Sequence, residues 1–170
     1  PELPRLTTLE LYANELEELP LLAKWKNLEN LDLKYNKLTD LKPLAGLTKL
    51  KSLDLEQGNP IKDLAPLSGL TLLTNLKLAS REISDLTPLS GLTQLKSLQL
   101  SRNKVTSLTP LAGLTNLENL HLSANKITDF SPLKGLTNLK KLGIFSLGLG
   151  RNQISEDQKE MLRKALPNCE

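Results

Sequence analysis

Leucine residues recur along the chain at an almost constant spacing. Successive repeats begin 22 residues apart, with one step of 23, at Leu6, Leu28, Leu50, Leu73, Leu95, Leu117 and Leu139. They follow the pattern LxxLxLxxNxIxxLxPLxGLxx, as in LENLHLSANKITDFSPLKGLTN from Leu117, and one inserted residue near Gly58 explains the longer step. A period of roughly 20 to 50 residues is typical of repeat architectures. We therefore expect one domain of stacked units over residues 6–27, 28–49, 50–72, 73–94, 95–116, 117–138 and 139–154.

Each unit predicts a short strand followed by a turn. The LxL segment alternates with a period of two, so its leucines point inward and the residue between them points outward. Stacked units place these strands side by side in a parallel sheet on the concave side. The Pro-Leu pair that follows excludes a long helix, so the convex side is expected to be extended or 3-10 helical. The fold class is an α/β solenoid of leucine-rich repeats with a C-terminal capping helix.

An asparagine occurs where most units leave the strand, and these residues are Asn14, Asn36, Asn59, Asn103, Asn125 and Asn152. The chain turns inward there, and its backbone groups are not paired by the sheet. A buried amide side chain can bond to such groups, so we interpret the series as an asparagine ladder. The fourth unit carries Arg81 instead. Because an unpaired buried charge is costly, we expect either that Arg81 turns to solvent or that this turn is distorted.

The two ends of the chain differ in pattern. Ser155, followed by Gln158, forms a predicted capping box for an amphipathic helix over residues 156–166, which Pro167 stops. Residues 155–170 are thus a predicted C-terminal cap. The segment before it, around Gly143–Gly150, exceeds the pattern by about five residues if Leu147 and Leu149 form the last inward pair, which predicts an ejected loop. At the other end Leu3 aligns with the leucine of GLTxL, so the chain is expected to be a fragment of a longer protein.

The runs DLTPLSGLTQL and SLTPLAGLTNLENLHLSANKITDF resemble the 22-residue repeats of the bacterial internalin family, over Leu6 to Asn138. More loosely, they resemble leucine-rich proteins of the eukaryotic phosphatase-regulator type. The internalin resemblance implies a right-handed solenoid that grips protein partners on its concave face, and a secreted or cell-surface location. Internalins also carry an N-terminal helical cap and usually an immunoglobulin-like domain, neither of which we find in this sequence.

Composition narrows the classes of partner. The chain has 22 basic and 19 acidic residues, a net charge of +3 that is too small and too evenly spread for nucleic-acid binding. No apolar run approaches the roughly 20 residues that a membrane span requires, and the N-terminal stretch does not resemble a signal peptide. Membrane insertion is therefore not expected. With 3% aromatic residues, the core must be aliphatic.

Residue types that carry chemistry are isolated in this sequence. His121 lies between two leucines without clustered partners, and Cys169 occupies a leucine position. Gly148 and Gly150 form a pair too weak to predict a phosphate-binding loop. The recurring aspartates fall on the same turn of each unit, where bonding to the backbone is their usual role: Asp40, Asp63, Asp85 and Asp129. We therefore predict no catalytic residue, no metal and no cofactor, and a protein that is not an enzyme.

Function is expected from the outward positions of the concave face. The predicted partner-binding residues are Glu10, Tyr12, Asp32, Lys34, Tyr35, Asp54, Lys77, Arg102 and His121. Of these, five should form one contiguous exposed patch whose acidic residues favour a partner with basic groups: Tyr12, Asp32, Lys34, Tyr35 and Asp54. The leading hypothesis is a protein-interaction module. Two alternatives stay open, namely that these are only solvated scaffold positions, and that the chain is the targeting segment of a larger multidomain enzyme or GTPase.

Overall fold

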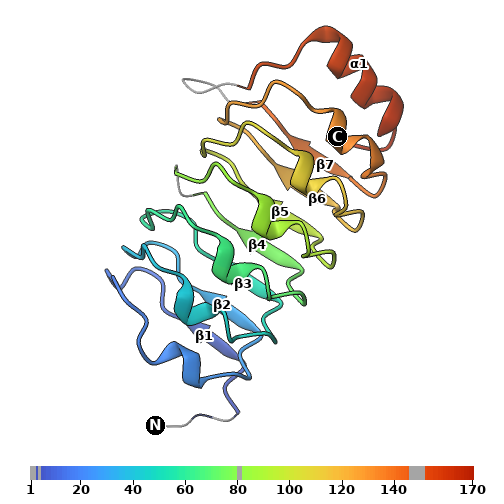
Figure 1. Cartoon of the computed structure of the whole chain (residues 1–170). Helices are drawn as coiled ribbons and strands as arrows, with labels where there is room; N and C mark the ends of the chain where they lie inside the picture. The colour runs from blue at the N-terminus through green and yellow to red at the C-terminus, as the bar shows by residue number, and fades with distance from the viewer. Residues whose placement is uncertain (1–2, 4, 80–81, 146–151) are drawn as a thin grey trace.

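Seven parallel strands form one sheet in chain order (Figure 1). The computed structural model describes residues 3, 5–79, 82–145 and 152–170. The strands are β1 (Thr8–Glu10), β2 (Asn30–Asp32), β3 (Ser52–Asp54), β4 (Asn75–Lys77), β5 (Ser97–Gln99), β6 (Asn119–His121) and β7 (Lys141–Gly143). Each strand pairs with the next at the same repeat position, so that Leu9 faces Leu31 and Leu120 faces Leu142. The predicted fold class is confirmed.

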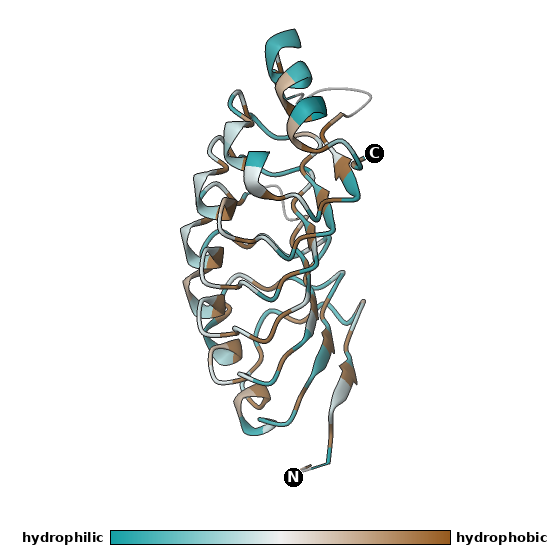
Figure 2. Ribbon diagram, turned by 90° about the vertical axis from the view of Figure 1, so that its right-hand side faces the viewer, coloured by the Kyte–Doolittle hydropathy of each residue, from teal (hydrophilic) through white to brown (hydrophobic). Residues whose placement is uncertain are grey.

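The side opposite the sheet consists of short 3-10 turns (Figure 2). These are η1 (Leu22–Lys24), η2 (Lys42–Leu44), η3 (Ala65–Leu67), η4 (Thr87–Leu89), η5 (Thr109–Leu111) and η6 (Ser131–Gly135). Proline opens η2 to η6 because its fixed φ suits the start of a helical turn and it has no N–H to leave unpaired. In front of four of these turns an aspartate Oδ1 accepts the backbone N–H two residues later, always at 2.8 Å. The predicted role of Asp40, Asp63, Asp85 and Asp129 is confirmed.

The core lies between the sheet and the turns and is almost entirely leucine. Leu50, Leu95 and Leu117 have no exposed surface, and Phe130 is buried equally at a leucine position of the sixth unit. Full burial of such a side chain contributes roughly 1.5 to 3 kcal/mol before the cost of chain entropy. Because each leucine packs against the units on both sides, this contribution depends on neighbouring repeats.

The asparagine ladder is present in the interior repeats. Asn125 Nδ2 donates to the carbonyls of Leu100 and Leu122, both at 2.9 Å, and its Oδ1 accepts the N–H of Val105 at 3.0 Å. Equivalent bonds link adjacent units at Asn36, Asn59, Asn103 and Asn152. Asn14 is the exception, because its side chain is exposed and, among the described residues, donates to Tyr12 O in its own turn and to no other unit. Arg81 lies outside the described residues.

The last strand differs from the prediction. Leu142 and Ile144, not Leu147 and Leu149, are the inward pair, since Leu142 follows Leu120 by one period and pairs with it. The repeat pattern therefore continues unbroken through Ile144, and the additional residues come after the strand rather than before it. Residues 146–151, which include Gly148 and Gly150, are outside the described part of the chain.

Helix α1 (Glu156–Ala165) covers the β7 end of the solenoid (Figure 1). Ser155 accepts the N–H of Gln158, which confirms the predicted N-cap. Gln158 makes a different bond from the one expected, because its Oε1 accepts the N–H of Phe130 at 2.9 Å and so ties the helix to the sixth repeat. Leu162 and Leu166 are buried.

The chain end adds a second element to this cover. Glu170 donates its N–H to Lys140 O at 2.9 Å and accepts the N–H of Leu142 at 2.8 Å, so it pairs with the outer edge of β7. Cys169 next to it is half-buried and packs against the core, as expected, and burial raises the pKa of its thiol.

Candidate partner-binding face

The outward side chains of β1 to β7 and of the residues that follow each strand form one continuous surface, here called the strand face. Its central row is set by the strand register and consists of Glu10, Asp32, Asp54, Lys77, Gln99, His121 and Gly143. All nine predicted partner-binding residues lie on the strand face or on the turns that directly follow its strands. Neighbouring strands are separated by about 4.8 Å, so side chains from adjacent units can contact one another.

The charges in the first part of this face are largely paired. Asp32 Oδ1 accepts the backbone N–H of Lys34 at 3.1 Å, and its Oδ2 forms an ion pair with Lys34 Nζ at 2.9 Å. This bond raises the pKa of the Lys34 ammonium group. Asp54 repeats the arrangement, with the N–H of Glu56 at 3.0 Å and Lys77 Nζ at 3.0 Å.

The expectation that Asp54 belongs to an exposed patch is wrong. Asp54 is only 8% exposed, because its carboxylate turns onto the backbone and Lys77 covers its second oxygen. The sequence could not reveal this, since the same residue type at the same position in the second repeat, Asp32, remains half-buried.

Two tyrosines are the exposed aromatic residues of the patch. Tyr12 is 51% exposed and Tyr35 is 50% exposed. Lys34 Nζ lies 5.2 Å from the centroid of the Tyr12 ring, within the range of a cation-π contact. The structure thus brings Tyr12, Lys34 and Asp32 together as one group, and places Tyr35 on the next turn position of the second repeat.

Tyr35 and its equivalents share an uncommon backbone conformation. The residues just before the ladder asparagines have a φ of about 55° to 60°, and they are Ala13, Tyr35, Gln57, Arg102 and Ala124. In the third repeat the inserted Gly58 follows with a φ of 81°. A β-carbon on Gly58 would lie 2.5 Å from Asn36 O, so only glycine fits there.

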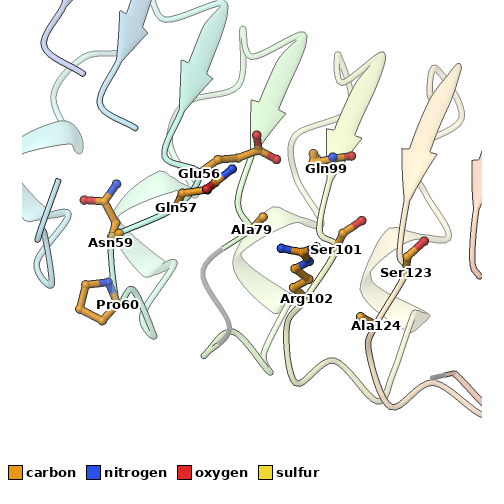
Figure 3. Close-up of a pocket in the computed structure, with 11 residues that line it drawn as sticks. Glu56, Gln57, Asn59, Pro60, Ala79, Gln99, Ser101, Arg102, Ser123 and Ala124 are labelled. Atoms are coloured by element: carbon orange, nitrogen blue, oxygen red, sulfur yellow. The ribbon is translucent and has the colours of Figure 1, made fainter. Parts of the chain in front are cut away.

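A polar hollow of about 680 Å³ lies over the repeats of β3 to β6 (Figure 3). Its floor is formed by small side chains at the same position after the strand in three successive repeats, namely Ala79, Ser101 and Ser123. Glu56, Gln57, Gln99 and Arg102 surround this floor. Of these four residues, only Arg102 was in the predicted set. The signal in the sequence was the change from Tyr12 and Lys34 to small residues at the same repeat position.

Glu56 and Arg102 carry opposite charges on two sides of the hollow. Burial raises the pKa of Glu56, the nearby Asp54 carboxylate raises it further, and Lys77, a hydrogen bond from Gln99 and Lys34 oppose the shift. Arg102 is exposed, and no described residue forms an ion pair or a side-chain hydrogen bond with its guanidinium group. Figure 3 shows the carboxylate of Glu56 directed toward Gln99 and the guanidinium group of Arg102 directed toward Ala79.

The remaining predicted residues lie at the two ends of the row. Glu10 is exposed on β1. His121 is half-buried and lies over Gly143, where an added β-carbon would come within 2.7 Å of its Nδ1. The described residues contain no group of three or more histidine, cysteine, aspartate or glutamate side chains arranged to hold a metal ion. Among them there is also no helix long and apolar enough to cross a membrane.

Comparison with known proteins supports the same architecture. A family model for leucine-rich repeats in two copies matches residues 26–69 and 115–164. The crystal structure of internalin C2 from Listeria monocytogenes is 38% identical, with a TM-score of 0.88, over 96% of this chain and 68% of that one. Internalin F from the same organism is 32% identical, with a TM-score of 0.83, over 92% of this chain and 45% of that one. No curated protein sequence matches.

A more distant similarity extends to plants. The leucine-rich repeat ectodomain of a membrane receptor kinase from Arabidopsis thaliana, solved in complex with Casparian strip integrity factor 2, is 25% identical, with a TM-score of 0.75, over 93% of this chain and 20% of that one. Taken with the seven in-register strands, the 3-10 turns and the asparagine ladder, these matches show that the chain belongs to the leucine-rich repeat proteins of the bacterial internalin type.

Proposed function

We propose that this chain is a non-catalytic protein-interaction module that binds its partner through the strand face. The observation that carries the proposal is the pair of half-exposed tyrosines, Tyr12 and Tyr35, on a scaffold whose interior leucines have no exposed surface. Leucine-rich repeat domains commonly serve as protein-interaction modules, which supports this assignment.

The strand face is suited to binding because little order has to be gained on association. Its residues are held by the sheet and by the ladder, so the backbone loses little freedom when a partner binds. Tyrosine offers a large contact area for the loss of two side-chain torsions. The ring of Tyr12 is further positioned by Lys34, which Asp32 holds in turn.

The ion pairs change the expected basis of recognition. Since Asp32 and Asp54 are already neutralised by lysines, acidic attraction contributes less in this region than the sequence implied. The tyrosines should therefore provide most of the binding energy in this part of the face.

The test compares protein capture by the immobilised parent chain and by three variants. Tyr12→Ala and Tyr35→Ala should each weaken retention of the specific partner about fivefold or more, which corresponds to roughly 1 kcal/mol. Lys134→Ala lies on the opposite side, in η6, and should retain the partner as the parent does. Quantitative mass spectrometry of the captured proteins gives the readout. If both tyrosine variants retained every protein that the parent retains, binding would not involve this surface.

A further inference from the structure

The hollow over β3 to β6 contains two opposite charges that the fold itself does not use as a pair. We propose that it receives one acidic and one basic side chain from a single segment of the partner protein, the acid against Arg102 and the base against Glu56. This inference rests on the proposed function, because it assumes that the strand face binds a protein.

Arg102 provides the acid-binding side. Its guanidinium group has no ion-pair partner in the described part of the chain, whereas Lys34 and Lys77 on the same face are both paired with aspartates. Guanidinium groups bind carboxylates through two parallel hydrogen bonds, which makes arginine more selective for them than lysine. Ser101 and Ser123 line the same hollow and can add hydroxyl donors.

Glu56 provides the base-binding side. Lys77, the nearest cation on the next strand, is already paired with Asp54 at 3.0 Å. Glu56 instead keeps a hydrogen bond from the neutral amide of Gln99, and burial holds its pKa above the usual value. Lys77 and Lys34 compensate the carboxylate only partly, and a cation supplied by the partner would add a direct ion pair.

The floor between the two charges leaves room for a partner. Ala79 separates the Glu56 and Arg102 sides, and Ser101 and Ser123 extend the floor toward β6 (Figure 3). At the same repeat position Tyr12 and Lys34 carry long side chains, so the floor of small residues belongs to the fourth, fifth and sixth repeats.

Strand spacing sets the separation of the two charges on the ligand. Glu56 follows β3 and Arg102 follows β5, which are two strand steps apart, or roughly 10 Å. A peptide in the polyproline II conformation advances about 3.1 Å per residue with three residues per turn, so every third side chain points to the same side. The partner segment should therefore carry its basic and acidic side chains about three positions apart.

The experiment titrates the labelled whole chain with three capped peptides and follows the backbone amide signals by NMR. The peptides share a glycine-serine background and carry lysine and glutamate, two glutamates, or two lysines, three positions apart. We expect the mixed peptide to bind about fivefold or more tightly than either of the others. Its shifts should centre on Gln57, Ala79, Gln99, Ser101 and Arg102.

Arg102→Gln is the decisive variant. Glutamine already occupies the corresponding place in the third repeat, where Gln57 has a φ of 56°, so the turn should fold normally. Arg102→Gln should weaken the peptides that contain glutamate about fivefold or more and leave the two-lysine peptide unchanged. Glu56→Gln should weaken the peptides that contain lysine and leave the two-glutamate peptide unchanged. Lys134→Gln, the matched charge control, should change the affinity of none of the three peptides.

Two results would overturn the proposal. One is binding of the two-lysine or two-glutamate peptide as tight as that of the mixed peptide, and the other is an unchanged affinity of the mixed peptide for Arg102→Gln. Either result leaves the proposed function standing if Tyr35→Ala still loses the natural partner. Conversely, if Tyr12→Ala and Tyr35→Ala retained the partner as the parent does while the peptides bound as expected, the tyrosine surface would be rejected and the hollow would not.

Discussion

The two ends of the solenoid are built from the same repeat, but they differ in how many of their apolar side chains are covered and how many of their polar groups are hydrogen-bonded. At the β7 end, α1 covers the last turn, Gln158 bonds to Phe130, and Glu170 pairs with the strand edge. At the β1 end, Leu3 and Leu21 are 44% and 50% exposed, and the side chain of Asn14 turns to solvent. The indole Nε1 of Trp25 is buried there without a partner among the described residues.

This difference shows that a repeat is completed by its neighbour and not by its own sequence. Asn14 and Asn125 occupy the same repeat position, yet only Asn125 has carbonyls of a preceding unit within reach. Leu9 and Leu98 are equivalent in the sheet, yet Leu9 is half-buried and Leu98 has no exposed surface. Stability should therefore depend on position along the array, which the following four predictions test.

Removal of residues 156–170 should have the largest effect. It exposes the final repeat and loses the burial of Leu162 and Leu166, which together contribute roughly 3 to 6 kcal/mol. Urea denaturation followed by circular dichroism would measure the loss, and light scattering would detect association through the uncovered β7 edge. A truncated chain that stayed monomeric with an unchanged midpoint would show that α1 does not complete the fold.

Equivalent leucines should differ in cost. Leu98→Ala removes a fully buried side chain and should lower the free energy of unfolding by about 2 to 5 kcal/mol. Leu9→Ala lies on β1 and should cost less than about half as much, because its side chain is already partly in water. The comparison uses urea midpoints of both variants at one pH. Equal losses would contradict the idea that burial by neighbours sets the contribution.

The ladder should show the same dependence on position at a smaller scale. Asn125→Ala leaves the carbonyls of Leu100 and Leu122 and the N–H of Val105 without their partner, at a cost of about 1 to 3 kcal/mol. Asn14→Ala removes only a bond within an exposed turn and should stay within about 0.5 kcal/mol of the parent. Thermal unfolding of the two variants gives the measurement, and a large loss for Asn14→Ala would contradict the dependence on position.

The smallest expected effect is on the pH dependence of stability, and it compares Glu56 in the interior repeats with Glu156 at the β7 end. Burial raises the pKa of Glu56, so its contribution destabilises the fold above that folded-state pKa and disappears as the pH falls below the usual glutamate value. Glu56→Gln should therefore be more stable than the parent at pH 7, with the gain vanishing below about pH 4.

Glu156 is the matched case of opposite sign. The hydrogen bond from Lys159 lowers the pKa of Glu156, so its contribution stabilises the fold above the usual glutamate pKa and is lost as the pH falls through the lowered value. Glu156→Gln should be less stable than the parent at pH 7 and equal to it in strong acid. Urea midpoints between pH 3 and 7 would test both signs, and parallel curves for the two variants would refute the assignment.

Periodic features of the fold could be predicted from the sequence because many units repeat the same constraint. The strands, the proline-initiated turns and the asparagine bonds each follow from a residue type that recurs at one position. The errors fall where a single unit departs from the others. Leu147 and Leu149 match the LxL pattern and were therefore assigned as the inward pair, although Leu142 and Ile144 continue the 22-residue period of the strands.

The candidate site was less predictable because it depends on contacts between units. The burial of Asp54 results from Lys77 in the next repeat, and the hollow results from small side chains in three consecutive repeats. Both effects appear only when equivalent positions of neighbouring units are considered together. The sequence identified Arg102 as an outward residue, but only the geometry shows that none of the described residues forms an ion pair with it.

The left-handed turn position has a consequence for how such a domain can change over time. Tyr35, Gln57 and Arg102 adopt a left-handed backbone conformation that is lower in energy for glycine. Each of these positions nevertheless carries a side chain. The ladder asparagine fixes each turn, directly after Tyr35 and Arg102 and one residue further on after Gln57, and the side chain at this position varies from tyrosine to arginine while the ladder is kept. If the strand face binds a partner as proposed, the residue that sets specificity and the residue that maintains the fold are neighbours, and a new binding preference could arise by one substitution per unit without a change in the solenoid.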